Sequence, residues 1–298
     1  MDELLIGIGS ALLLAAGFFV LRPLLLSLPQ NDARRQAASP IPAQWTSLLD
    51  TAAPAMRHLS DEQRTLLLGA SSELIRTRHW EGCQGLVLTE EMQLIIAAHA
   101  CLLTLAIPGE PFPGLREILV YPATFVPRTV RDPRKWVRTN ERDRPLPELG
   151  ESWGNGIIVI SWDAVSEGAR DPSDGHNVVL HEFAHELAYE YDLTPAGVDR
   201  AWKPRVENPD RWSSILQRAY ERLDAKVAAH APSVMSDYGA TDIAEFFAVA
   251  TEVFFERPEE LDHEDPELYD LFCTFYRQDP ATHFMKLDAT SGLTGRKR

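Results

Sequence analysis

Two histidines at a spacing of four residues, with a glutamate directly after the first, constrain this chain more than any other feature. The motif reads His181-Glu182-Phe183-Ala184-His185. On a helix, positions i and i+4 lie on one face, so both imidazoles can bind one zinc ion. Glu182 can then take a proton from a zinc-activated water as general base. The motif predicts a helix at this position and hydrolysis of peptide bonds.

The residues around the motif favour a helix over about 177–191. Asp174, Gly175 and Asn177 are typical of a helix start. Apolar residues recur at helical spacing at Val178, Val179, Phe183, Ala184 and Leu187. The alternative is that both histidines are surface or capping residues. Because unsatisfied imidazoles on a buried helix are costly, the pattern favours metal binding.

A catalytic zinc site needs three protein ligands, so a third ligand must come from another segment. A third histidine six residues after His185 is excluded, because Tyr191 occupies that position. Residues 236–255 read as a loop that runs into an apolar helix, and this helix carries Glu245 and Glu252 on one face. Metal ligation would explain why carboxylates occur in so apolar a helix.

Each of these two glutamates has an alternative role. Glu245 can belong to a capping box in which Asp242 is the N-cap. Glu252 can accept a hydrogen bond from a ligating histidine, which would fix the orientation of the imidazole ring.

These residues resemble the Mlc titration factor A (MtfA) peptidases, which are zincins related to the catalytic domain of anthrax lethal factor. The resemblance rests on residues 181–185 and on Tyr238, seven residues before Glu245 in a Glu-Phe-Phe-Ala-Val-Ala run. It covers about residues 45–280 and extends through Gly85-Leu-Val-Leu, Ile95-Ala-Ala-His-Ala-Cys-Leu, Leu119-Val-Tyr-Pro and Gly150-Glu-Ser-Trp. After the second histidine the family usually has Lys-Leu-Asp, where this chain has Glu186-Leu187-Ala188.

The resemblance implies an α+β, zincin-like metallopeptidase domain of the gluzincin type, with a small mixed sheet and an active-site helix. It implies one Zn²⁺ per chain, an aminopeptidase-like activity, and a peptide or protein as substrate. The implied zinc ligands are His181, His185 and Glu245, with Glu182 as general base. Tyr238 is implied to stabilise the oxyanion.

In zincins, the strand before the motif helix is a sheet edge that pairs with an extended substrate. The residues that stand in the corresponding place are Gly156, Ile157, Ile158 and Val159. Pairing through the backbone accepts many substrate sequences.

Two other functions stay open. By resemblance, the chain can be a regulator that sequesters a transcriptional repressor such as Mlc without needing catalysis. It can also be a membrane-tethered scaffold with a structural zinc, although structural sites normally have four protein ligands.

The N-terminus contains an uncharged apolar run over residues 4–21, which is long enough to span a bilayer. A secretory signal fits poorly, because the chain opens with Asp2-Glu3 and no small-residue cleavage site follows the run. A buried core helix is the other alternative. Arg22, Arg34 and Arg35 follow the run and favour a cytoplasmic C-terminal side. We therefore expect a single-pass protein of the inner membrane with a cytoplasmic catalytic domain.

The expected organisation is a transmembrane anchor at 1–29, a tether at 30–58, a peptidase domain at 59–285 and a disordered tail at 286–298. Ser60-Asp-Glu-Gln63 predicts a helix to about 78, and a second, core helix is expected from Glu90 to Leu105. Strands are expected at 118–121 and 156–162.

Composition limits the remaining functions. The net charge of −15 disfavours a nucleic-acid partner, because phosphate binding needs a basic surface. Three widely spaced cysteines fit a reducing compartment. The acidic segment 256–270 reads as a solvated face.

Overall fold

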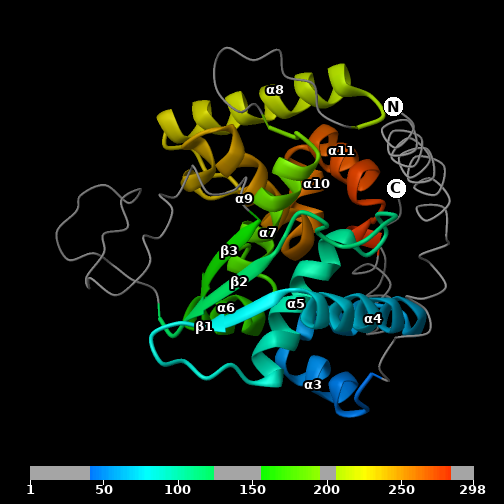
Figure 1. Ribbon diagram of the computed structural model, residues 1–298. Helices are drawn as coiled ribbons and strands as arrows, with labels where there is room; N and C mark the ends of the chain where they lie inside the picture. Colours follow the sequence, from blue (N-terminus) through cyan, green and yellow to red (C-terminus); the bar gives the residue numbers. More distant parts are fainter. Residues whose placement is uncertain (1–40, 124–155, 195–205, 283–298) are drawn as a thin grey trace, which may run out of the picture. The chain divides into compact units, whose positions relative to one another are not determined.

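The computed structural model describes residues 41–123, 156–194 and 206–282. Among these residues, a three-stranded sheet lies beside two groups of helices, one from each end of the described chain (Figure 1). The N-terminal group contains α3 (Gln44–Ala52), the 3-10 helix η1 (Pro54–His58), α4 (Asp61–Thr77) and α5 (Glu90–Thr104).

The predicted capping box of α4 is confirmed. The Ser60 hydroxyl accepts a hydrogen bond from the Gln63 backbone, and the Gln63 side chain accepts one from the Ser60 backbone. Thr89 caps α5 in a similar way through the backbone N–H of Met92. Both helices therefore begin where local sequence signals place them.

The predicted tether is wrong for residues 41–58, which form α3 and η1. Trp45, Leu49, Ala53 and Met56 are buried in the core, and the Trp45 indole donates a 2.8 Å hydrogen bond to Glu90 at the start of α5. The Pro-, Ala- and Gln-rich composition of residues 30–58 conceals the helical spacing of these buried side chains, which follow one another at intervals of four, four and three residues. Residues 30–40 lie outside the described residues.

The sheet consists of β1 (His79–Gly82), β2 (Glu117–Tyr121) and β3 (Ile157–Ser161), in that order. All three strands are parallel, so the expected mixed sheet is wrong for the described strands. Parallel strands need a crossover connection, and α5 supplies it between β1 and β2. Strand direction depends on that connection, which strand sequences do not encode.

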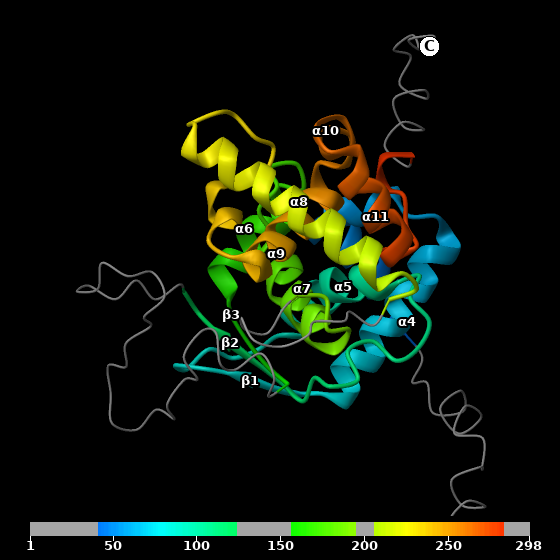
Figure 2. The ribbon, with the colours of Figure 1, turned by 90° about the horizontal axis from the view of Figure 1, so that it is seen from above.

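Helix α7 (Val178–Glu190) lies near the middle of the domain, between the strands and the C-terminal helices (Figure 2). It contacts β3, α5, α6 (Trp162–Arg170) and α9 (Ile243–Glu256). The sheet turns a face of aliphatic side chains toward the core, made of Ile118, Val120, Ile158 and Ile160. The motif helix is thus held on several sides.

The C-terminal group contains α8 (Pro209–Ala228), η3 (Asp237–Ala240), α9, α10 (Pro258–Glu264) and α11 (Pro266–Tyr276). Aromatic rings fill the space between α9 and α11. Phe254 lies 5.7 Å from Phe272 and 5.4 Å from Tyr276, measured between ring centroids. Together with α7 and η3, this packing buries α9 on almost every side.

The prediction that the acidic segment 256–270 is a solvated face is wrong for part of the segment. Glu256 and Asp265 are both buried. Asp265 caps α11 through the backbone N–H of Leu268 and forms an ion pair with Arg222. A charge run in the sequence does not distinguish solvated carboxylates from capping or paired ones.

No helix in the described ranges is long and apolar enough to cross a membrane. The predicted anchor at 1–29 and the predicted tail at 286–298 both lie outside those ranges, so they stay predictions.

The burial of Trp45 gives a test of where the folded domain begins. We expect Trp45→Ala to lower the free energy of unfolding by about 3–5 kcal/mol, because it removes a large buried side chain and leaves a cavity. Trp45 is 4% exposed, whereas Leu66 on α4 is 56% exposed and supplies a control. Leu66→Ala should change the free energy by about 0.5 kcal/mol or less in the same urea titration. If Trp45→Ala and Leu66→Ala both changed the free energy of unfolding by an equal, small amount, residues 41–58 would lie outside the part of the chain that unfolds cooperatively.

Candidate metal centre

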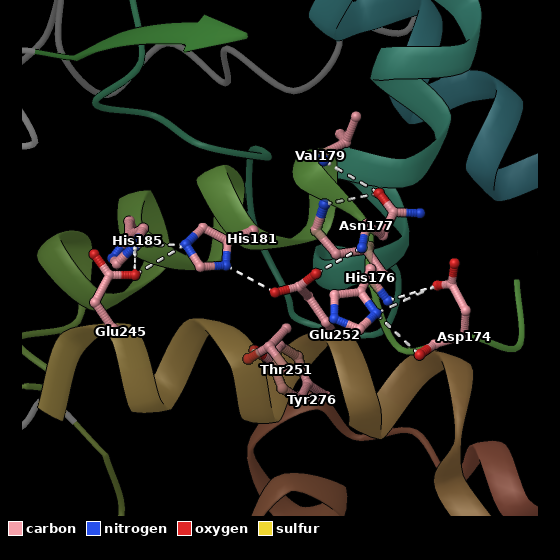
Figure 3. Close-up of polar contacts among 11 residues, drawn as sticks. Asp174, His176, Asn177, Val179, His181, His185, Glu245, Thr251, Glu252 and Tyr276 are labelled. Carbon is pink, nitrogen blue, oxygen red and sulfur yellow. Dashed lines mark hydrogen bonds and ion pairs between the residues drawn. The ribbon is translucent and has the colours of Figure 1, made fainter. Parts of the chain in front are cut away.

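Helix α7 presents both histidines of the motif on one side, toward α9 (Figure 3). The helix begins at the predicted place, because the Asn177 side chain accepts hydrogen bonds from the backbone N–H groups of Val179 and Leu180. His185 is buried and His181 is mostly buried. Their Nε2 atoms lie 3.2 Å apart. The two imidazoles therefore converge on one point.

Helix α9 brings the third candidate ligand to that point. A Glu245 carboxylate oxygen lies 3.1 Å from Nε2 of His181 and 3.4 Å from Nε2 of His185. Tetrahedral zinc, with bonds of about 2.0–2.1 Å, holds its ligand atoms about 3.3 Å apart. The three donor atoms thus form a nearly equilateral triangle of the size that zinc requires, and three is the ligand number of catalytic zinc sites.

The capping role considered for this part of α9 belongs to Asp242. Its carboxylate accepts hydrogen bonds from the backbone N–H groups of Ala244 and Glu245. The Glu245 carboxylate itself reaches the two histidines. Asp242 therefore caps the helix, and the Glu245 carboxylate is left available for a metal.

Glu252 contacts the other nitrogen of His181. One carboxylate oxygen lies 2.7 Å from Nδ1 of His181, and the second accepts a 2.6 Å hydrogen bond from the backbone N–H of Asn177. This is the contact to a histidine of the motif that was considered above as the alternative role of Glu252. In the neutral imidazole, a carboxylate on Nδ1 keeps the proton on that nitrogen, so Nε2 is the nitrogen that can bind a metal.

Glu182 has a free, buried oxygen. Its Oε2 atom has no hydrogen-bond partner in the part of the chain that the structure describes. Burial raises the pKa of Glu182 to about 7, against the attraction of His181 and together with the repulsion of Glu245 and Glu252. A carboxylate of this pKa can both accept and release a proton near neutral pH.

The charges around the histidines explain the other shifts. Burial acts to lower the pKa of His181, but hydrogen bonds to Glu245 and Glu252 and the charges of nearby carboxylates raise it to about 10. Burial also acts to raise the pKa of Glu245, yet hydrogen bonds with His181 and His185 hold it far below the usual range. The cluster of carboxylates therefore favours a positive charge at its centre.

Tyr238, on η3, lies beside the histidines. Its ring centroid is 5.9 Å from that of His181, and the residue is 49% exposed. Burial of the hydroxyl, the charge of Glu245 and a hydrogen bond to Glu245 raise the pKa of Tyr238 well above its usual value. The hydroxyl therefore keeps its proton and can donate it in a hydrogen bond.

The predicted edge strand is the outer strand of the described sheet. Ile157, Ile158 and Val159 belong to β3, which pairs only with β2 in the described sheet, and Gly156 immediately precedes β3. Gly156 has a φ of 65°, and an added Cβ would lie 2.2 Å from the Gly114 carbonyl oxygen. Only glycine fits at this position.

Sequence reasoning missed three buried polar residues near the site. Asn177 was predicted only as a start signal, and Glu256 was placed in the solvated run. Glu186 is 1% exposed, and neither carboxylate oxygen has a partner in the described residues. A usable signal existed for Glu256, since it follows Glu252 by four residues on the same apolar helix.

The comparison with known proteins agrees with this geometry. Residues 29–277 match the family described as glucose-regulated metallo-peptidase M90. Mlc titration factor A of Serratia proteamaculans is 32% identical over 251 residues, which cover 83% of this chain and 91% of the relative. The chain belongs to the MtfA family of metallopeptidases. An MtfA relative from Cronobacter sakazakii is 31% identical over 91% of this chain and 98% of its own length. An uncharacterized Synechocystis protein is 36% identical over 81% of this chain and 86% of its own length.

The buried Glu186 predicts a pH-dependent stability. Burial, aided by the charge of Glu190, raises the pKa of Glu186 from 4.5 to about 7. Between these values the unfolded chain binds fewer protons than the folded one, so this group makes the fold less stable as pH rises. We therefore expect the free energy of unfolding of Glu186→Gln to rise relative to that of the native chain as the pH increases from 5 to 8. The expected increase in this difference is on the order of 2 kcal/mol.

Urea titrations at several pH values would measure that difference. Glu62→Gln, at an exposed position in the first turn of α4, controls for the loss of one negative charge. A difference between Glu186→Gln and the native chain that stays constant with pH would contradict the prediction.

Proposed function

We propose that this chain is a zinc-dependent peptidase with one Zn²⁺ held by His181, His185 and Glu245. The observation that carries the proposal is the convergence of these three donor atoms within 3.1–3.4 Å of one another. Beside them lies a carboxylate oxygen of Glu182 that has no hydrogen-bond partner among the described residues. A bound zinc ion supplies a Lewis acid that activates water and polarises a carbonyl group.

The residues of the chain carry the proton steps. Glu182 accepts the proton of the attacking water and delivers it to the amine that leaves. The Tyr238 hydroxyl donates a hydrogen bond to the oxygen that becomes negative as the carbonyl is attacked. Glu252 holds His181 in the orientation that presents Nε2 to the metal.

The substrate is proposed to be an extended peptide. Within the described residues, one edge of β3, at residues 156–159, has no strand partner and offers backbone groups for pairing. Such pairing selects extended chains with little regard to side chains. The family resemblance favours an aminopeptidase, which acts only on peptides with a free N-terminal amine.

The motif predicts a separation of metal binding from turnover. Glu182→Gln should keep stoichiometric zinc and lower the turnover number by about 10²–10⁴-fold, because the amide cannot accept the proton. His185→Ala should lose both zinc and activity, because it removes a ligand. Metal analysis and peptide cleavage measured on the same samples would test this. An active Glu182→Gln variant would refute the mechanism.

The hydroxyl of Tyr238 gives a second kinetic prediction. Tyr238→Phe should lower kcat by about 10²–10³-fold and leave KM within about threefold, since the hydrogen bond acts in the transition state. Steady-state kinetics would separate the two constants. A change confined to KM would instead assign Tyr238 to substrate binding.

The first experiment is to measure zinc content and hydrolysis of chromogenic peptides with free and blocked N-termini, with Glu182→Gln as control. Cleavage of free peptides alone, dependent on Glu182, would support an aminopeptidase. Cleavage of both kinds would indicate an endopeptidase. Zinc without cleavage would favour the second candidate function below.

The second candidate is a regulator that binds a transcriptional repressor. The names of the relatives, Mlc titration factor A, favour a repressor of the Mlc type as partner. Such binding need not use the metal, so Glu182→Gln should bind the repressor as tightly as the native chain does.

The predicted anchor forms a separate proposal about location. We propose that residues 1–29 hold the catalytic domain at the cytoplasmic face of the inner membrane. Protease digestion of inverted and right-side-out vesicles would test this, because only inverted vesicles should expose the domain.

A further inference from the structure

Three carboxylates on one side of α9 face α7. Glu252 follows Glu245 by seven residues and Glu256 follows Glu252 by four, which places all three along one stripe of the helix. Glu245 contacts the histidines, while Glu252 and Glu256 both contact Asn177 at the start of α7. The three glutamates therefore contact α7 at two places, which are its motif histidines and its N-terminus.

Asn177 uses all of its polar groups at this joint. The residue is 2% exposed, and its side-chain oxygen accepts hydrogen bonds from two backbone N–H groups of α7. This fixes the amide plane, so the side-chain nitrogen donates to a Glu256 oxygen at 3.0 Å. The backbone N–H donates to Glu252 at 2.6 Å. The cap of α7 and the orientation of Glu252 thus share one residue (Figure 3).

The orientation of the Glu252 carboxylate is fixed once Asn177 is held in place. One of its oxygens contacts Nδ1 of His181, and the other accepts the Asn177 backbone N–H. If Asn177 moved, the carboxylate plane would rotate and the His181 ring would follow. A continuous path of hydrogen bonds therefore runs from Glu256 through Asn177 and Glu252 to His181.

Glu256 is an unusual residue to bury without a structural purpose. It is mostly buried, and its second oxygen, Oε2, has no hydrogen-bond partner in the described ranges. Burial raises the pKa of Glu256 to about 8 against the opposing hydrogen bond from Asn177. The side chain is therefore mainly neutral at pH 7, where it accepts from Asn177 without adding charge beside Glu252.

We propose that Asn177 and Glu256 are positioning residues of the metal centre, which orient His181 through Glu252. This inference rests on the proposed zinc site but not on peptide cleavage. It concerns how firmly the metal is held and how its ligands are arranged.

The test measures metal rather than activity. Zinc affinity is determined by competition with a chelator, and ligand geometry by the visible absorption of the Co²⁺-substituted protein. Glu256→Leu removes the acceptor and should weaken zinc binding about tenfold, with a changed cobalt spectrum. Glu256→Gln keeps an acceptor oxygen for Asn177 and should restore zinc affinity to within about twofold of the native value. Asn177→Ser keeps a capping oxygen but is too short to reach Glu256, so it should resemble Glu256→Leu.

Thr251→Val is the matched control on the same helix. Thr251 is buried and forms a 2.8 Å hydrogen bond with the Tyr276 hydroxyl, away from α7. This variant should lose stability in urea while keeping native zinc affinity and the native cobalt spectrum.

Native zinc affinity and spectrum in both Glu256→Leu and Asn177→Ser would overturn the inference. So would an equal loss of affinity in Thr251→Val, since that would show a general effect of lower stability. If the native chain binds zinc but cleaves no peptide, the proposed peptidase fails while the affinity comparison still decides this inference. If the native chain binds no zinc, both proposals fail.

Discussion

The contact between α7 and α9 is the interaction on which the rest of this structure depends. Helices α7, η3 and α11 together bury α9 on nearly every side, so its glutamates lose much of their hydration. A carboxylate that stays charged without its hydration needs partners, and α7 supplies them as imidazoles and backbone N–H groups. Packing and polar satisfaction thus impose one arrangement of the two helices, and that arrangement assembles the site.

The same burial accounts for the electrostatics of the centre. Glu182, Glu245 and Glu252 gather around two histidines, and a positive charge at their centre offsets the repulsion. A protonated His181 or a divalent metal can supply that charge, and both compete for the same nitrogen. The site therefore favours a cation among its three donor atoms, which lie at zinc-like separations from one another.

Local sequence signals predicted the two helices that carry the site. The His-Glu-Phe-Ala-His spacing, the Asn177 cap and the Asp242 cap each act within a few residues, so they can be read from a single segment. Of the fold, the start of α4 and the position of β3 were predictable for the same reason. The parallel direction of the strands was not, and neither was β1, whose sequence His-Trp-Glu-Gly lacks the usual strand pattern.

The sequence by itself determined which residues can bind a metal and on which helix face they lie, because helical periodicity is local. Only the tertiary structure decided that Glu245 meets His181 across 64 positions of the chain, that Trp45 belongs to the core, and that Glu256 is buried on Asn177. Resemblance to a family anticipated the first of these. For Glu256 the only signal was its place four residues after Glu252 on an apolar helix, and that spacing does not name Asn177 as its partner. The reason is physical: whether a carboxylate or an indole is solvated depends on which distant segments pack over it, and no short stretch of sequence encodes that packing.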